Sequence, residues 1–138
     1  MRFYTLSGKL VNKNLNKFLI KWDGKCRSII QFKVKQFLKP YWSGMIIMEE
    51  MPCAGTLLHV DLVNLTLKIA IEVNGNQHSA FNPFFHNNDP NRYLKGYKND
   101  VKKSEWLAKN DFKLIEINED EINLLSKQFF LEKFNLVL

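Results

Sequence analysis

The sequence predicts a mixed α/β fold in one domain that follows a short basic extension. Its 138 residues suffice for one hydrophobic core, and 46% of them are hydrophobic. Segments with the apolar spacing of helices alternate along the chain with segments of strand-like alternation. The turn signal Asp23-Gly24 falls near the end of the extension, residues 1–26, and the domain takes residues 27–138.

The domain is predicted to begin with a helix. Ser28 suits an N-cap, and apolar residues recur at helical spacing from Ile30 to Leu38. Lys39-Pro40 is expected to end this helix. A short apolar run over residues 45–48 and a turn over residues 52–55 follow.

Two strands come next, and they are predicted to form an antiparallel hairpin over Leu57–Val63 and Leu67–Val73. Alternation puts Asp61 and His59 on one face of the first strand, with Leu58, Val60 and Leu62 on the other. On the second strand, Glu72 shares its face with Lys68, Ala70 and Asn74.

The remaining elements are an irregular loop, a helix, a strand and a last helix. Asn and Pro residues over 76–91 disfavour regular structure. Apolar spacing predicts a helix over residues 92–109, and Phe112–Ile117 is predicted to be a strand. Asn118 is expected to cap a final helix.

The charge is positive and unevenly distributed. The formal net charge is +6 and the sequence pI is about 9.3. Between Lys9 and Lys39 the chain carries nine lysines and arginines and a single acid, Asp23. A polyanion is therefore the first partner to consider, because neutralised phosphates release counterions. The residues that interleave basic and aromatic groups there, and that we predict to contact DNA, are Lys21, Trp22, Lys25, Arg27, Lys33 and Lys35.

Cysteine usage and hydropathy exclude several classes. Cys26 and Cys53 have no C-x-x-C spacing, so neither a disulfide framework nor a cysteine zinc site is implied. No apolar run approaches the ~20 residues of a membrane span, and the first residues do not show the apolar h-region of a signal peptide. We expect a soluble, cytoplasmic protein without membrane contact.

The polar faces of the hairpin carry the candidate chemistry. If those faces coincide, the carboxylates of Asp61 and Glu72 converge, and a divalent cation such as Mg²⁺ would offset their repulsion. The turn Asn74-Gly75 would bring Gln77 and His78 back over the strand end. A neutral imidazole there is suited to activating water.

The predicted second helix adds two charged groups to this picture. Asp100 and Lys103 are three residues apart and therefore lie on one helix face. Asp100 would add a carboxylate to the metal site, and Lys103 would direct an ammonium toward a phosphate.

Four segments together resemble the core of the PD-(D/E)XK nucleases, over roughly residues 28–120. The closest branch contains the very-short-patch-repair endonucleases and the phage homing endonucleases similar to them. The segments are residues 57–61, residues 69–78 from Ile69 to His78, Asn99-Asp100 with Lys103 and Trp106, and Phe112–Ile117.

The resemblance implies a restriction-endonuclease-like core of a helix, a three-stranded antiparallel meander, a helix and a strand. It also implies cleavage of double-stranded DNA with Mg²⁺ or Mn²⁺. Asp61 and Glu72 match the two metal-binding positions, His78 the general base and Asp100 the aspartate at the start of the later helix. Lys103 or Gln77 would steady the phosphate.

Two positions depart from the family pattern. The family's lysine, two residues after the second acid, is Asn74 here, although the repair-endonuclease branch uses a histidine instead. The glutamate expected on the first helix falls near Gln31, so Glu49 or Glu50 would have to supply that acid.

Other interpretations stay open. The chain can be a DNA-binding module that has lost catalysis, or a nuclease directed at RNA. His78 and His86 can instead belong to a ββα-metal (HNH-type) site, although this leaves the paired acids unexplained. A homodimer is possible, and a phage-encoded enzyme would act in the cytoplasm of a bacterial host.

Overall fold

The computed structural model describes residues 1–75 and 90–138, and its centre is a four-stranded mixed sheet. The strand order is β3-β4-β5-β6, where β3 is Ile47–Pro52, β4 His59–Asn64, β5 Ile69–Asn74 and β6 Lys113–Asn118. The first three strands form an antiparallel meander, and β6 pairs in parallel with β5. The predicted hairpin is confirmed, and the fold is mixed α/β.

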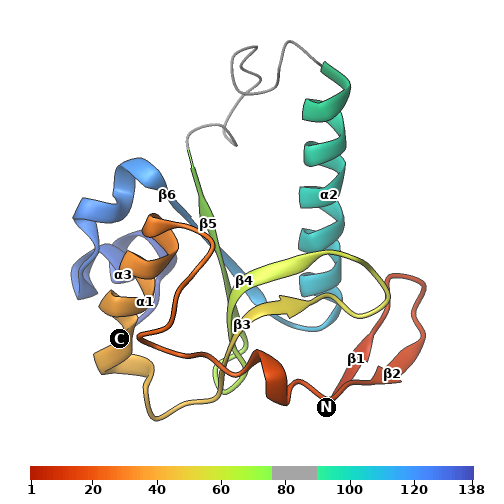
Figure 1. The fold of residues 1–138 in the computed structure, drawn as a ribbon, viewed down its shortest axis with the longest axis horizontal. Coiled ribbons are helices and arrows are strands. Elements are labelled where there is room, and N and C mark those ends of the chain that lie inside the picture. The colour runs from red at the N-terminus through yellow and green to blue at the C-terminus, as the bar shows by residue number, and fades with distance from the viewer. Residues whose placement is uncertain (76–89) are drawn as a thin grey trace.

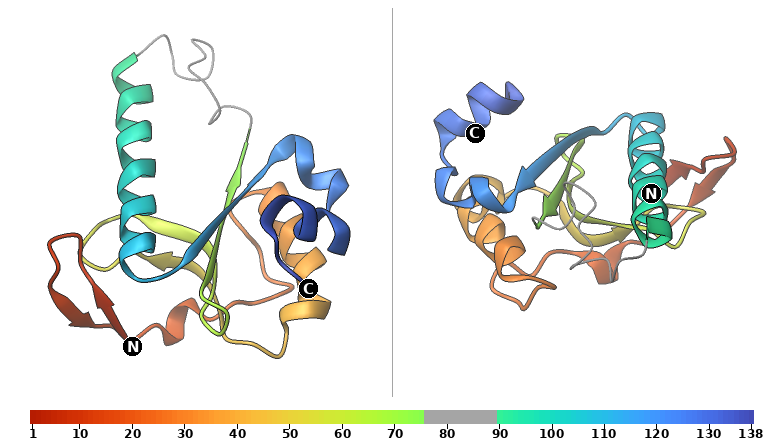
Figure 2. Two further views of the ribbon diagram at one scale, coloured as in Figure 1. Left: turned by 180° about the vertical axis from the view of Figure 1, so that it is seen from behind. Right: turned by 90° about the horizontal axis from the view of Figure 1, so that it is seen from above.

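Helices cover both faces of the sheet (Figure 1). Helix α1, Ile29–Trp42, and helix α3, Lys127–Phe134, lie together on one face. Helix α2, Pro90–Lys109, lies on the opposite face, as the views from behind and above show (Figure 2). Two hydrophobic clusters correspond to these layers, one containing Leu38 and Phe130 and the other Trp106.

Helix α1 begins where the sequence predicts. The Ser28 side chain accepts a hydrogen bond from the backbone N–H of Gln31, at 3.1 Å. The expected end at Lys39-Pro40 is wrong, since the helix continues through Pro40 to Trp42. A proline this close to the C-terminus removes only one helical hydrogen bond, and burial of the Trp42 side chain favours the extra turn.

The C-terminal part is more finely divided than predicted. Asn118 and Glu121 form a capping box, but the helix they begin is a 3₁₀ helix, η3, over Glu119–Leu124. Helix α3 then begins with its own N-cap, Ser126. The single final helix expected from the sequence is therefore two short helices.

The N-terminal residues form a small antiparallel hairpin of β1, Arg2–Tyr4, and β2, Leu10–Asn12, followed by the 3₁₀ helix η1, Asn16–Phe18. The Phe3 side chain is buried and its ring lies 5.4 Å from that of Trp106. Asn110, at the end of α2, bonds both the N–H and the carbonyl of Tyr4. Hydrogen bonds and aromatic packing therefore join the hairpin to α2.

One irregularity interrupts the alternation of β3 and β4. Glu50 has a positive φ of 54°, a conformation that non-glycine residues seldom adopt. On β4, Leu62 and Val60 pair with the residues on either side of Glu50, and Val60 packs in the cluster with α2 whereas Leu62 packs in the cluster with α1. The prediction that Val60 and Leu62 share a face is therefore wrong, because the kink beside Asp61 shifts the side-chain period by one.

No helix in the described part of the chain is long and apolar enough to cross a membrane.

Candidate active site

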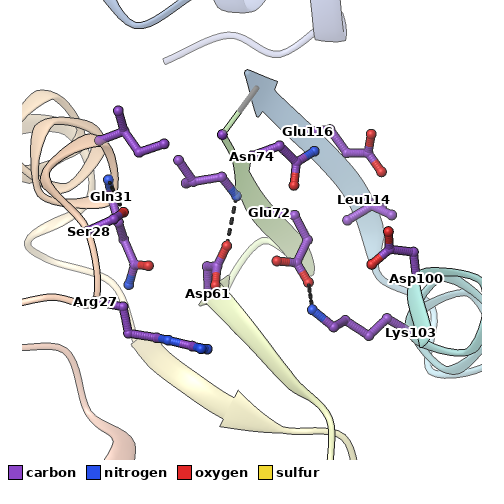
Figure 3. Close-up of a pocket in the computed structure, with 13 residues that line it drawn as sticks. Arg27, Ser28, Gln31, Asp61, Glu72, Asn74, Asp100, Lys103, Leu114 and Glu116 are labelled. Atoms are coloured by element: carbon purple, nitrogen blue, oxygen red, sulfur yellow. Dashed lines mark hydrogen bonds and ion pairs between the residues drawn. The ribbon is translucent and has the colours of Figure 1, made fainter. Parts of the chain in front are cut away.

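Strands β4 and β5 separate at the position of Asp61. Their paired residues run from Asn64↔Ile69 to Leu62↔Ile71, and Asp61 is the next residue along β4. In place of a further backbone pair, Asp61 Oδ2 accepts a hydrogen bond from the Val73 N–H at 2.8 Å (Figure 3). The aspartate is thus fixed by backbone at the point where the sheet opens.

Glu72 lies beside Asp61, and the predicted convergence of the two carboxylates is present (Figure 3). The Glu72 side chain is only 12% exposed. Burial and the neighbouring Asp61 carboxylate raise the pKa of Glu72 to about 8. Two like charges in this position are unfavourable, so the pair favours either a bound proton or a cation.

A cavity of about 370 Å³ contains this pair. Its walls come from the start of α1, the ends of β4 and β5, helix α2 and strand β6. The lining is mainly polar and includes Arg27, Gln31, Asn74, Asp100 and Glu116 (Figure 3). A cavity with both carboxylates and cations is suited to a charged ligand rather than to an apolar one.

Helix α2 supplies a cation to the pair. Lys103 Nζ lies 2.8 Å from Glu72 Oε1, and the Lys103 side chain is 21% exposed. Burial alone would lower the pKa of the Lys103 ammonium, but Glu72, Asp61 and Asp100 outweigh it and raise that pKa. Lys103 therefore stays charged inside the cavity.

Asp100 also lines the cavity, one helical turn from Lys103, and is exposed. The structure thus brings together four of the residues predicted from the sequence, Asp61, Glu72, Asp100 and Lys103.

Helix α1 contributes a polar network beside the cavity. The buried Gln31 amide donates to Glu49 Oε2 at 3.0 Å and to Glu50 Oε1 at 3.3 Å. Lys35 Nζ lies 3.0 Å from Glu49 Oε1, and Arg27 pairs with Glu50 at 3.5 Å. The two glutamates are thus held by α1 and do not line the cavity, although Gln31 and Arg27 do.

One predicted DNA contact needs correction. Lys35 is fully buried and bonds Glu49 and the Gly24 carbonyl, so its ammonium does not reach a surface where a phosphate would lie. The prediction grouped Lys35 with the exposed Lys33, but Lys35 lies on the buried face of α1 with Gln31 and Leu38, where its ammonium pairs with the half-buried Glu49. Among the other predicted contacts, Lys21, Lys25, Lys33 and Arg27 are exposed and Trp22 is half-buried.

Three predicted residues lie outside the described residues: Gln77, His78 and His86. Two residues of the cavity that the sequence analysis did not single out are Asn74, noted there only as a departure, and Glu116. The parallel register pairs Glu116 with Glu72 across β5 and β6. The alternation of β6 was a signal for Glu116, since Ile115 and Ile117 flank it and point into the core.

Among residues 1–75 and 90–138, no three His, Cys, Asp or Glu side chains stand close enough together to hold a metal ion. The residues that offer ligands are the two carboxylates of Asp61 and Glu72, with Asp100 on the same cavity. Mg²⁺ commonly takes one or two protein carboxylates and keeps several waters, so a pair of acids is compatible with it.

Comparisons with known proteins leave the family open. No family profile matches the sequence, and no solved structure matches the chain. The chain is 36% identical over 66 residues to uncharacterized protein 033L of Invertebrate iridescent virus 3. That match covers 48% of this chain and 34% of the viral protein, so it spans about a third of its relative's length.

Proposed function

We propose that this chain is a metal-dependent endonuclease of the PD-(D/E)XK type that hydrolyses phosphodiester bonds in duplex DNA. The observation that carries the proposal is the pair formed by Asp61 and Glu72 where β4 and β5 separate, inside a polar cavity. The two carboxylates can bind a cation, and Lys103 and Arg27, which also line the cavity, can bind a phosphate diester beside it.

The residues fit a divalent cation. The pKa of Glu72 is raised although Lys103 is in contact with it, so the lysine alone does not offset the repulsion between Glu72 and Asp61 in the metal-free protein. Asp61 and Glu72 would hold Mg²⁺ or Mn²⁺, with Asp100 as a further ligand. The ion would supply Lewis acidity and charge to the phosphate group.

The chain's own residues have separate roles in this proposal. Asp61 is oriented by the Val73 N–H, so its free oxygen faces the cavity in a fixed direction. Arg27 lies at the wall formed by α1 and binds a phosphate oxygen there. The water-activating role remains with His78, as the resemblance implies.

Lys103 supplies the ammonium group that the family's strand lysine would supply. At that strand position this chain has Asn74. The Lys103 ammonium reaches the acid pair from α2 instead of from β5. It pairs with Glu72 in the free protein and would contact the scissile phosphate when a cation is bound.

The test is a pair of substitutions on one strand. Asp61→Asn keeps the size of the side chain and its acceptor for Val73 but loses the charge. It is expected to lower the rate of plasmid nicking in Mg²⁺ by roughly 10²–10³-fold, the order seen when one group that stabilises the transition state is removed. His59→Asn, at an exposed position of the same strand, is the control and should keep the rate. Nicking that persists in Asp61→Asn would refute the site.

The second candidate is a DNA-binding module without catalysis. It is favoured by Asn74 at the family's lysine position and by the absence of a three-residue metal cluster among the described residues. Such a module would bind duplex DNA with a steep salt dependence and show no cleavage with any divalent metal.

A further inference from the structure

Helix α2 has two halves with different surroundings. In the C-terminal half, Trp106 and Leu107 are fully buried against the sheet and the N-terminal hairpin. In the N-terminal half, every residue from 94 to 102 is exposed except Asn99, which is half-buried. This half extends beyond the sheet (Figures 1 and 2). Nine residues correspond to about 13 Å of helix.

The outer surface of this projecting half carries two parallel stripes. Leu94, Tyr97 and Val101 recur at intervals of three and four residues, and they are 50%, 61% and 38% exposed. The adjacent stripe, at the same intervals, consists of Lys95, Lys98 and Lys102, all exposed.

The inner surface of the same helix belongs to the candidate active site. Asp100 and Lys103 line the cavity that holds Asp61 and Glu72. A strand of nucleic acid in that cavity would therefore pass directly along the inner side of α2. The three lysines face the opposite side, where a second strand of a duplex would lie.

We propose that the projecting half of α2 enters the major groove of duplex DNA. The major groove is about 12 Å wide and admits one α-helix. In this arrangement one DNA strand crosses the cavity, and Lys95, Lys98 and Lys102 contact phosphates of the other strand. Leu94, Tyr97 and Val101 face the floor of the groove, where base edges and thymine methyl groups are accessible.

This inference rests on the proposed function for its choice of partner, and charge complementarity supports that choice. Between residues 94 and 102 the helix carries three lysines and one acid, Asp100, which faces the cavity. An isolated apolar stripe would favour a protein partner, whereas a lysine stripe beside it favours a polyanion.

The experiment compares two triple variants of the full chain in an Asp61→Asn background without metal, so that the probe stays intact. One variant replaces Lys95, Lys98 and Lys102 by Gln. The control replaces Lys113, Lys127 and Lys133 by Gln, which are exposed lysines of β6 and α3 outside the basic segment from Lys9 to Lys39. Both lose the same charge, and circular dichroism checks that both are folded.

Affinity for a short random-sequence duplex is measured across a salt series. Each phosphate contact contributes about 0.9 to the slope of log K against log salt, so losing three contacts lowers the slope by about 2.7. We expect this change for the α2 variant and an unchanged slope for the control. Equal slopes for the two variants would overturn the proposal, because net charge alone would then explain binding.

A second measurement identifies the groove. With protein bound, dimethyl sulfate should modify guanine N7 in the major groove less, while adenine N3 in the minor groove stays reactive. Protection of adenine N3 alone would overturn the proposal. Binding to phosphatidylserine vesicles with no binding to the duplex would also overturn it, since the stripes would then dock on a membrane.

The two proposals fail in different ways. If the wild-type protein cleaves DNA with metal but the α2 variant keeps the wild-type salt slope, the groove contact is rejected and the proposed nuclease function stands. A lowered slope in a protein that never cleaves would support the groove contact and reject the nuclease.

Discussion

At the scale of single residues, Asp61 combines a structural and a chemical task. Its carboxylate replaces a missing strand hydrogen bond at the Val73 N–H and also repels the buried Glu72 carboxylate. The first interaction stabilises the fold and the second destabilises it. Active sites commonly contain such opposed effects, because the groups that bind a charged ligand repel one another when the ligand is absent.

Asp61→Asn is therefore expected to increase the stability of the metal-free protein at alkaline pH. The Glu72 pKa of about 8 lies above its ordinary value, so wild-type stability falls as pH rises from about 5 toward 8 and Glu72 ionises. The variant keeps an acceptor for Val73 and removes one charge, so a gain of about 1 kcal/mol at pH 9 is expected.

Urea unfolding in EDTA at pH 5 and pH 9 measures this difference. The gain should shrink toward pH 5, where Glu72 is protonated in the wild type as well. A variant that is less stable than wild type at both pH values would mean that repulsion within the pair is negligible.

The sequence predicted the acid pair but not the network around it. The polar positions of Asp61 and Glu72 on neighbouring strands, each beside apolar core residues, were enough to predict that they meet, although the alternation of β4 itself fails beside Asp61. Lys35 was not predictable in the same way. Its spacing from Gln31 and Leu38 puts it on the buried face of α1, unlike Lys33, but a lysine is normally expected at the surface, and its partner Glu49 comes from a strand 14 residues later.

At the scale of elements, short-range signals determined where helices begin better than where they end. Ser28 caps α1 as predicted, because an N-cap is a local hydrogen bond. Pro40 did not end that helix, since packing of Trp42 against the sheet is a tertiary effect. The positive φ of Glu50 had no signature in the sequence either, so the change of strand period beside Asp61 was missed.

The capping box of η3 gives a prediction at this scale. Burial alone would raise the pKa of Glu121, but its ion pair with Lys133 and the Asn118 N–H outweigh burial and lower that pKa. A lowered carboxyl pKa contributes stability above the ordinary value of 4.5, and this stability is lost as pH falls. Glu121→Gln should therefore cost about 0.5–1 kcal/mol at pH 7 and nothing near pH 3.

Chemical unfolding at the two pH values tests this, with Glu105→Gln, an exposed acid on α2, as the control. A Glu121→Gln cost that is the same at both pH values would show that packing, not charge, is the property that matters.

At the scale of the whole molecule, the N-terminal hairpin is part of the packing that positions α2. Phe3, Trp106 and Phe112 form one aromatic group, and Asn110 ties the end of α2 to Tyr4. The sequence did not indicate this, because β1 and β2 are each three residues long, too short to show a period-two pattern. Long-range contacts of this kind leave no periodic signal.

Phe3→Ala should therefore destabilise the whole fold by about 3–5 kcal/mol, the usual cost of removing a buried phenyl ring. Tyr4→Ala is the matched control, since the Tyr4 side chain is 46% exposed while its backbone bonds to Asn110 persist. Thermal unfolding by circular dichroism compares the two. Similar midpoints for both variants would mean that the hairpin does not support α2.

The central claim is that this chain cleaves duplex DNA with a divalent metal at Asp61 and Glu72. The most direct measurement is incubation of supercoiled plasmid with wild-type protein in Mg²⁺, in Mn²⁺ and in EDTA. The account predicts nicked or linear plasmid with either metal and intact plasmid in EDTA. Plasmid that is bound but stays supercoiled with both metals would contradict it and favour the DNA-binding module.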